Sequence, residues 1–541
     1  MISAPHHFSA AGIAMFSFVK RARPVRLLAA AVVPALLLGV GGAAAAATHT
    51  LTVTVINRNG VKVKAGIKLV DVVSSSTYSA TSGAAKKLPK GTYAVLTSVT
   101  TGATITLSGK AVKVSGSTKL TIDARQGKGV GLAVSPAPTG LERTITMRIC
   151  TRTSASDGVE ASASPGTKLF IVPFASKYLG FAALGSWSDH SGTSNSYAVL
   201  HHTNGVPGGL GRTFSKGQLA AIKVVQKRGP SGSIYSDLAM QAIGGGCGDS
   251  LYAGLGGTDR PTATTVFASP GTWDVRVSSS APTKTGETWN IGSYFAQRKV
   301  AAGKSYGLNF FNSAWGPSAQ LPVTIRGRIS FGLNEMFADP GFPRDGSVEG
   351  GDKAVATLDF GGKRVAGKQD KGWEPEMTYL YYTVKKAGWY TLTTTATRYY
   401  PEITFPAGMM STTSRVTYRF QSKPNASALA GVYSAHLLPT GLSLTNKAKA
   451  GSTTKVAIRL YRTSGDPDAK RGTDPKLSKL TAQMSPDSGQ TWRTVPVQKV
   501  NGTWYATVTN PKTSAVALKV RATVAGGAYT EATVFRAYGI G

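Results

Sequence analysis

Polar and apolar residues alternate along much of the chain with a period of two. The run Thr50–Ile56 alternates and ends in the turn signal Asn57–Gly60. The runs Val61–Val73 and Thr118–Ala124 repeat the pattern, whereas the best helical pattern, Gly217–Gln226, is short. Alternation is typical of strands with one buried and one solvated face. The pattern therefore predicts an all-β fold.

A small internal repeat indicates how the strands are grouped. Three segments place a glycine just before a strand that begins with an aromatic residue: Pro89–Val95, Pro270–Val275 and Lys386–Leu392. Glycine allows a tight turn, and the aromatic side chain can anchor its strand on the core. Because the three segments lie far apart, we expect several tandem β-sandwich domains, Ig-like or prealbumin-like.

The N-terminal residues have the order of a secretory signal peptide. Four basic residues come first: Lys20, Arg21, Arg23 and Arg26. An apolar run, Leu27–Val40, and the small residues Gly41–Ala47 follow. Pro34 interrupts the run, which is short for a membrane span, so an uncleaved anchor is the weaker alternative. We expect a secreted, extracellular chain whose translation begins at Met1 or Met15.

The mature chain, roughly 490 residues, is long enough for three or four domains. We place boundaries near Arg125, Gly327 and Lys423. The expected segments are a signal peptide (1–47), a carboxypeptidase-regulatory-like sandwich (48–125), a β-rich middle domain (126–325), a β-sandwich (326–425) and an Ig-like sandwich (426–541).

The chain is strongly basic, with a formal net charge of +35. Residues 1–47 hold four basic and no acidic residues, so their removal leaves about +31. Such a charge would attract anionic polymers outside the cell, such as cell-wall phosphate polymers, acidic polysaccharides or DNA. The densest group is Lys62, Lys64, Lys68, Lys86, Lys87 and Lys90. The alternative is a solvated charged face that keeps the protein soluble.

The only cysteines are Cys150 and Cys247. In an oxidising compartment, an isolated pair most simply forms a disulfide, and the alternative is two free buried thiols. Neither a CxxC motif nor a Cys/His spacing indicates a zinc site.

Two regions resemble known families. Residues 50–125, with Asn59–Gly60 and Leu88–Tyr93, resemble a carboxypeptidase-regulatory-like, prealbumin-type sandwich. Residues of about 373–541 are similar to the non-catalytic C-terminal extension of large secreted bacterial subtilisin-like proteases. The motifs that carry this similarity are Met484–Trp492, Val516–Ala522 and Val534–Tyr538, with Trp373–Phe420 a looser match. The resemblance implies a β module of that kind, here without a protease domain.

One segment also fits the Asp-box pattern found in sialidases and in many unrelated β proteins. Its pattern residues are Ser485, Asp487, Gly489, Thr491 and Trp492. In such a turn the aspartate accepts backbone hydrogen bonds, the glycine takes a positive φ and the tryptophan packs beneath the hairpin. A sialidase needs several boxes, an arginine cluster and a tyrosine nucleophile, so we expect a structural hairpin.

Two serines lie in motifs that look catalytic. Gly248–Leu251 matches a lipase/esterase motif around Ser250, but the required downstream Asp-x-x-His is missing, because Tyr433 precedes His436 by three residues. The motif around Ser194 is similar to that of subtilases, which need an earlier His-Gly-Thr segment that this chain lacks. We therefore expect no enzyme, with a cryptic serine hydrolase as the weaker reading.

Metal ligands are the weakest of the candidate sites. Asp189, His190, His201 and His202 match no metal spacing, so ordinary loop and strand residues are expected there. Between Asp339 and Asp352 lies a glycine-rich acidic loop that could hold a structural Ca²⁺. Its other acidic residues are Asp345 and Glu349. We expect no cofactor beyond that.

These features favour a secreted, non-enzymatic binding or structural protein that engages anionic wall polymers or polysaccharide. The alternative is an accessory or regulatory partner of a secreted protease. A regulator of intracellular nucleic acid is disfavoured, because no DNA- or RNA-binding motif is present. Several tryptophans could stack on carbohydrate or anchor sandwich cores instead: Trp187, Trp273, Trp289, Trp315, Trp373 and Trp389.

Overall fold

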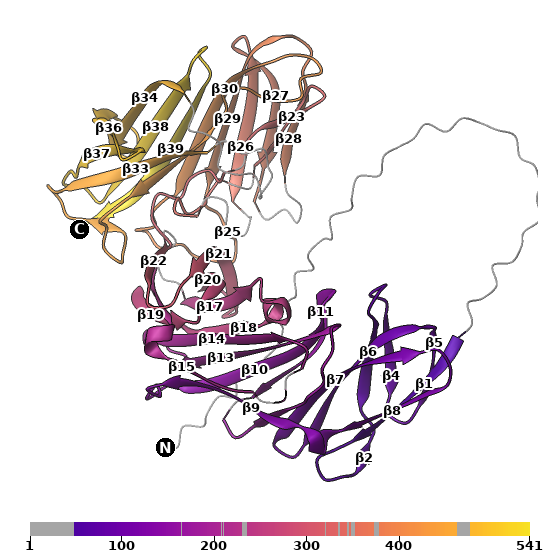
Figure 1. The fold of residues 1–541 in the computed structure, drawn as a ribbon. Helices are drawn as coiled ribbons and strands as arrows, with labels where there is room; N and C mark the ends of the chain where they lie inside the picture. Colours follow the sequence, from indigo (N-terminus) through magenta and orange to yellow (C-terminus); the bar gives the residue numbers. More distant parts are fainter. Residues whose placement is uncertain are drawn as a thin grey trace, which may run out of the picture. The chain divides into compact units, whose positions relative to one another are not determined.

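The computed structural model confirms the all-β fold (Figure 1). It describes residues 48–163, 165–206, 208, 210–229, 235–319, 321–333, 336–342, 346–347, 352–372, 378–461 and 476–541. The predicted signal peptide, residues 1–47, lies outside the described residues. Besides strands, the described part contains three short 3-10 helices: η1 (Ala124–Gln126), η2 (Lys216–Gln218) and η3 (Gly246–Ser250). The segment with the best helical pattern, Gly217–Gln226, forms the end of η2 followed by a strand.

The first strands form two sheets. The smaller sheet has the order β2 (Lys62–Val63), β1 (Thr48–Ile56), β5 (Ala85–Pro89), and β8 (Thr118–Asp123) pairs with β1 in parallel. The larger has the order β15 (Leu210–Ser215), β9 (Lys128–Ser135), β12 (Lys168–Val172), β7 (Thr104–Val114), β6 (Gly91–Thr101), β3 (Gly66–Asp71), β4 (Thr77–Thr81). Leu51, Val53 and Val55, the apolar positions of the first alternating run, are buried between them with Leu69 and Val95.

The middle of the chain builds two further sheets. One has the order β11 (Ser154–Ala163), β10 (Glu142–Thr151), β13 (Leu179–Ser188), β14 (Ser196–Asn204), β19 (Thr262–Ala268), β16 (Ala220–Gln226), β22 (Ser305–Phe310). The other has the order β18 (Tyr252–Thr258), β17 (Tyr235–Ile243), β20 (Gly271–Pro282), β21 (Thr288–Val300), β25 (Gly346–Ser347). Val224, Val266, Met240 and Val275 from both sheets share one apolar cluster, so these sheets pack face to face.

Three sheets contain the remaining strands. Two are small: β23 (Val323–Ile325), β24 (Arg328–Gly332), β28 (Tyr379–Thr383), and β31 (Ser434–Pro439), β33 (Thr453–Tyr461), β37 (Thr503–Thr509), β36 (Val497–Val500). The third, nine-stranded sheet runs β27 (Lys363–Asp370), β26 (Lys353–Phe360), β29 (Gly388–Thr397), β30 (Thr413–Ser422), β39 (Tyr529–Ile540), β38 (Ala515–Val524), β34 (Leu477–Ser485), β35 (Arg493–Val495), with β32 (Lys447–Ala448) also paired to β39.

Strand pairing continues across two of the expected domain boundaries. β9 and β15, beyond Arg125, belong to the same sheet as β3, β6 and β7. β30 and β39, on either side of Lys423, pair from Thr413↔Phe535 to Arg419↔Tyr529. The division into separate units at these positions stays a prediction, and the continuous sheets are what position the surfaces described below.

The glycine–aromatic repeat forms the same corner three times. Gly91, Gly271 and Gly388 begin strands β6, β20 and β29. Two residues later lies a buried aromatic side chain that donates a hydrogen bond to the carbonyl four residues before it. The three bonds are Tyr93 Oη to Pro89 O (2.8 Å), Trp273 Nε1 to Ser269 O (2.8 Å) and Tyr390 Oη to Lys386 O (2.7 Å). Each corner therefore buries a large ring while satisfying its polar atom.

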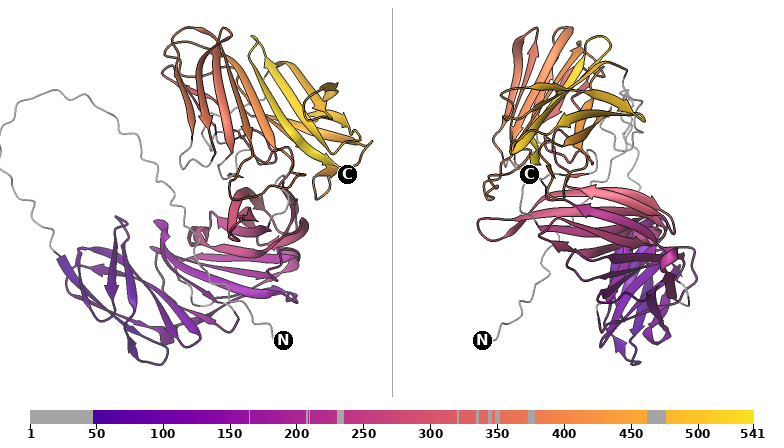
Figure 2. Two further views of the ribbon diagram at one scale, coloured as in Figure 1. Left: turned by 180° about the vertical axis from the view of Figure 1, so that it is seen from behind. Right: turned by 90° about the vertical axis from the view of Figure 1, so that its left-hand side faces the viewer.

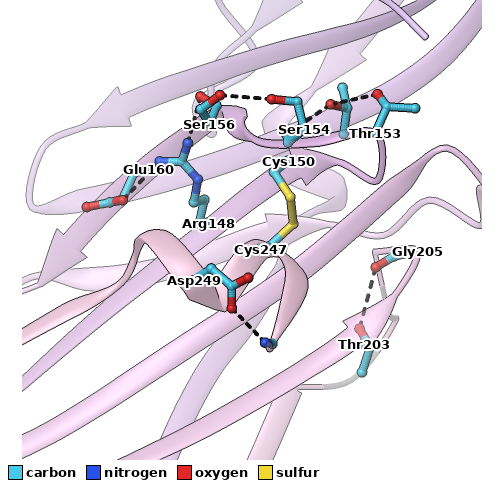
Figure 3. Close-up of a disulfide and its surroundings, with 12 residues drawn as sticks. Arg148, Cys150, Thr153, Ser154, Ser156, Glu160, Thr203, Gly205, Cys247 and Asp249 are labelled. Atoms are coloured by element: carbon cyan, nitrogen blue, oxygen red, sulfur yellow. Dashed lines mark hydrogen bonds and ion pairs between the residues drawn. A yellow bond between two sulfur atoms is a disulfide. The ribbon is translucent and has the colours of Figure 1, made fainter. Parts of the chain in front are cut away.

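Cys150 and Cys247 form the predicted disulfide, which Figure 3 shows linking β10 to helix η3. Both residues are nearly fully buried and belong to the same apolar cluster as Trp273. Around the bridge, Asp249 accepts a hydrogen bond from the amide of Gly245 (2.6 Å) and thereby closes the turn of η3. The alternative of two free thiols was wrong.

Two buried polar residues hold loops in the interior. Asn446 donates from Nδ2 to the carbonyls of Arg228 and Phe311 (both 2.8 Å) and accepts from the amide of Ser313 (3.2 Å). Asp339 accepts hydrogen bonds from the backbone and side chain of Asn312 and from the Gly341 amide. Burial raises the pKa of Asp339 to about 6, although these hydrogen bonds act in the opposite direction.

The described part of the chain contains no helix whose length and apolar content would suit a membrane crossing.

Candidate polyanion-binding face

The structure spreads the six sequence-predicted lysines over two sheets and the segments between their strands, where Lys64 and Lys90 lie. Lys62 pairs with Ile56 and Lys87 with Thr50, so they lie six positions apart along β1, roughly 20 Å. Lys68 lies in the other sheet, where its ammonium group contacts Asp157 at 3.1 Å. Polyanion binding by this set stays a prediction, and the set forms no compact cluster.

A denser group of cations lies on the nine-stranded sheet. In β29, β30, β39 and β38 alternate residues point into the core, such as Leu392, Val416, Val534 and Val520. The residues between them point to the opposite face. Figure 2 shows, from behind, the orange strands β29 and β30 beside the yellow strands β38 and β39. The face is therefore one continuous surface built from segments distant in sequence.

Four cations and four aromatic rings occupy this outer face, which we call the basic face. The cations are Arg415, Arg419, Lys519 and Arg521, and the rings are Trp389, Trp492, Tyr529 and Phe535. Arg415 and Lys519 both pair with Thr533 on β39, one from each side, so their backbones lie about 10 Å apart. The strand register fixes these spacings.

Each cation of the basic face lies over an aromatic ring. The distances to the ring centroids are 4.1 Å for Arg419 over Trp389, 3.9 Å for Lys519 over Trp492, 4.5 Å for Arg521 over Tyr529 and 5.8 Å for Arg415 over Phe535. A cation–π contact contributes about 0.5–1 kcal/mol at exposed sites. These contacts hold long side chains in place before a ligand arrives, which lowers the entropy cost of binding.

The hydrogen bonds of the arginines leave most of their donors available. Arg415 Nε donates to Thr395 Oγ1 (3.1 Å), and Arg419 Nη1 donates to the carbonyl of Gly527 (3.1 Å). A guanidinium has five N–H donors in a planar fork that matches carboxylate, sulfate or phosphate oxygens. Both arginines can therefore contact an anion without giving up these bonds.

The cations outnumber the acids on the basic face. Among the described residues only Arg521 of the four has an ion-pair partner, Glu531, at 2.8 Å. Burial lowers the pKa of Lys519, Glu531 opposes this effect, and the positive charges of Arg521 and Arg415 lower the pKa further. An anion bound beside Lys519 would relieve this repulsion.

Threonine hydroxyl groups fill the space between the cations. The hydroxyls of Thr393 and Thr417 lie 3.2 Å apart on neighbouring strands. The other threonines at alternate positions of β29 and β30 are Thr391, Thr395, Thr397 and Thr413. Hydroxyl groups both donate and accept hydrogen bonds, as the hydroxyls of a sugar do.

The six tryptophans expected either to stack on carbohydrate or to anchor a core differ in their exposure. Trp187, Trp273 and Trp315 are buried core anchors. Trp389 is partly exposed and lies on the basic face. The side chains of Trp289 and Trp373 lie outside what the structure describes. Trp492, the last Asp-box residue, supplies a second partly exposed ring on this face.

The Asp-box segment forms the turn between β34 and β35. Asp487 accepts hydrogen bonds from the Thr491 amide (2.9 Å) and from the hydroxyls of Ser485 (2.6 Å) and Thr491. These hydrogen bonds lower the pKa of Asp487 to about 2. Gly489 has φ +91°, and Trp492 packs edge-on against Phe535. The turn thus positions a ring of the basic face.

The described contacts of Ser194, His190 and His201 do not form a Ser–His–Asp triad. Ser194 donates a hydrogen bond to a carboxylate oxygen of Asp189 at 2.5 Å. His190 lies 3.7 Å from Glu142 and 3.4 Å from the hydroxyl of Ser188. Nδ1 of His201 lies 3.2 Å from Nη1 of Arg212, and the adjacent His202 is exposed. Ser250 lies at the end of η3.

A serine–histidine contact that sequence reasoning missed lies in β31. The hydroxyl of Ser434 is 2.5 Å from Nε2 of His436 and donates to the carbonyl of Ser318. Its sequence signal is the spacing of two, which places both side chains on one face of a strand. Ser434 is fully buried and His436 is 3 % exposed, so no substrate can reach them.

The acidic loop proposed for Ca²⁺ is only partly described. Asp339 accepts hydrogen bonds from Asn312 and from the Gly341 amide. Asp352 accepts a hydrogen bond from the Tyr399 amide and lies 3.5 Å from Arg398. Asp345 and Glu349 lie outside the described residues. In the part that is described, no group of three or more His, Cys, Asp or Glu could hold a metal ion.

Comparisons with known proteins identify no family. Neither the models of protein families nor the curated protein sequences match this chain. The resemblances to a protease extension and to a carboxypeptidase-regulatory-like domain therefore stay predictions.

Solved structures give matches to β proteins. A Ca²⁺-stabilised, ice-binding adhesin of an Antarctic bacterium is 11 % identical over 92 % of this chain and 100 % of its own, with a TM-score of 0.15. The major pilin subunit BcpA of Bacillus cereus is 8 % identical over 49 % and 99 %, with a TM-score of 0.14. SGBP-B of Bacteroides ovatus, solved with a mixed-linkage heptasaccharide, is 12 % identical over 57 % and 60 %, with a TM-score of 0.10. TM-scores this low carry no argument, so the fold assignment rests on the strands themselves.

Proposed function

We propose that this chain is a non-enzymatic extracellular binding protein that holds an anionic polymer on the basic face. The observation that carries the proposal is the array of four cations, each stacked on an aromatic ring and only one of them paired with an acid in the described residues. The threonine hydroxyls between them favour an acidic polysaccharide over a polyanion without hydroxyl groups.

Other features support a location outside the cell. Residues 1–47 have the pattern of an export leader, and the disulfide is of the kind that persists in oxidising compartments. The net charge of +35 would raise the local concentration of any polyanion near the surface.

Binding to polysaccharides of defined charge tests the proposal. The probes are polygalacturonate, dextran sulfate and neutral dextran, measured against the purified chain by fluorescence titration at low and at physiological salt. We expect binding to the two charged polymers that weakens as salt rises, and none to dextran. The variant Arg415→Gln/Lys519→Gln should bind about 10- to 100-fold more weakly, since it removes two charge-assisted contacts.

The matched control is Lys223→Gln/Lys455→Gln, which removes the same charge from exposed positions on other sheets. It should lose much less affinity than the variant on the basic face. Equal losses for both variants would show that net charge alone drives binding, and the proposal would be wrong. Binding to neutral dextran with the same affinity would contradict it as well.

A further inference from the structure

Strand β9 separates from its neighbour β12 and leaves a fork in the sheet. The two strands pair only through Phe170↔Gly129 and Ile171↔Lys128. From Val130 onward β9 pairs along its other edge with β15, as far as Ser135. On the β12 side, Lys168 and Leu169 pair with β7 alone. None of the described strands therefore lies between the two strand edges that face each other across the fork.

A pocket of about 440 Å³ lies in this fork. Its lining includes Val130 of β9, Lys168 and Leu169 of β12, Arg143 and Ile145 of β10, and Ala163 at the end of β11. This volume falls in the range of small-ligand sites. Most of the side chains are apolar, whereas the strand edges offer backbone N–H and C=O groups.

Two cations lie at this pocket. Arg143 and Ile145 point to the same face of β10, with Ile145 buried and Arg143 exposed, so the guanidinium lies toward the mouth. Lys168 is exposed at the start of β12. Neither has an ion-pair partner among the described residues, and both line the pocket directly. A ligand with an anionic end and an apolar body would match this lining.

We propose that the fork binds the C-terminal end of an extended peptide. The peptide backbone would pair with the free edges of β9 and β12, as in strand addition to a sheet edge. Its terminal carboxylate would contact Arg143 and Lys168, because a carboxylate accepts paired hydrogen bonds from a guanidinium. A small apolar side chain near its end would pack against Val130 and Ile145. This inference is independent of the basic face, which lies on another sheet.

The test compares two forms of one peptide. A fluorescently labelled hexapeptide of alternating Thr and Val, ending in Val, is titrated into the full chain as the free acid and as the C-terminal amide. We expect the amide to bind at least about tenfold more weakly, because it loses a charge-assisted contact. In Arg143→Gln the free acid should lose a similar factor, and amidation should then have little further effect. The control variant Lys119→Gln, at an exposed position of β8, should bind like the wild type.

A second variant fills the pocket without changing its charge. Ala163→Leu adds apolar atoms to a lining residue and should abolish binding, while the thermal unfolding midpoint shows that the chain still folds. Hydrogen exchange should slow at Val130–Gly131 and Lys168–Leu169 when the free acid binds. Equal affinity for the acid and the amide, unchanged binding by Ala163→Leu, or displacement of the peptide by glucuronate alone would overturn the proposal.

Discussion

The disulfide between Cys150 and Cys247 gives the sharpest test of what stabilises the chain. Removing it frees a loop closed over a sequence separation of 97 residues. In the chain-entropy model a loop of this length stabilises the folded state by about 4.7 kcal/mol at 25 °C. Both sulfur atoms are also buried in an apolar cluster. We therefore expect the cross-link to contribute more than any single hydrogen bond in the molecule.

The measurement is urea unfolding followed by tryptophan fluorescence, since Trp187 and Trp273 are buried. Oxidised chain is compared with chain reduced in denaturant and refolded in reductant, which replaces the S–S bond with two thiols and leaves the rest of the chain unchanged. We expect the free energy of unfolding to fall by about 4–5 kcal/mol. The free energy of unfolding of the variant Cys150→Ala/Cys247→Ala should be lower still, because the substitutions also leave a cavity. A loss below about 1 kcal/mol in the reduced chain would refute the entropic reasoning.

Three other perturbations follow from buried polar groups. Tyr93→Phe and Tyr390→Phe should each lower the free energy of unfolding by about 1 kcal/mol, since each leaves a corner carbonyl without its donor; a Tyr505→Phe control, on a partly exposed strand, should change less. Asn446→Ala should cost about 2–4 kcal/mol in the same urea assay, because two buried backbone groups and one partly buried group lose their partner, and a loss within error would contradict this. Burial raises the pKa of Asp339 to about 6, so its contribution is fully present below pH 4 and is lost as pH rises through 6. The stability difference from Asp339→Asn should change by about 3 kcal/mol between pH 4 and pH 8, and a flat difference would show that Asp339 titrates normally.

Features with a short period were predictable from the sequence. The alternation in Thr50–Ile56 became β1, and the glycine–aromatic segments became the first residues of three strands. The disulfide was predictable because the chain has two cysteines. The pattern did not predict which carbonyl accepts the hydrogen bond of each corner aromatic residue. The two groups come within bonding distance only after the turn before the strand has formed.

The basic face shows what local sequence patterns cannot predict. The spacings Arg415-x-x-x-Arg419 and Lys519-x-Arg521 each place two cations on one face of a strand, which the sequence already indicates. In the structure β39 lies between β30 and β38, because segments distant in sequence pair with each other. A local sequence pattern does not show which strand will lie beside another. Reasoning from the sequence therefore favoured the lysines that are close in sequence near the N-terminus, which the fold distributes over two sheets and the segments between their strands.

The position of β39 inside the nine-stranded sheet has a consequence for how the protein must be made. This strand follows every other strand of its sheet in the sequence, yet it separates β30 from β38. During synthesis the sheet cannot close until Tyr529–Ile540 has been released, and until then the edges of β30 and β38 are bare templates for aggregation. A proteolytic cut just before Tyr529 would break the covalent link between β38 and β39, and loss of the freed strand would expose both of these edges again.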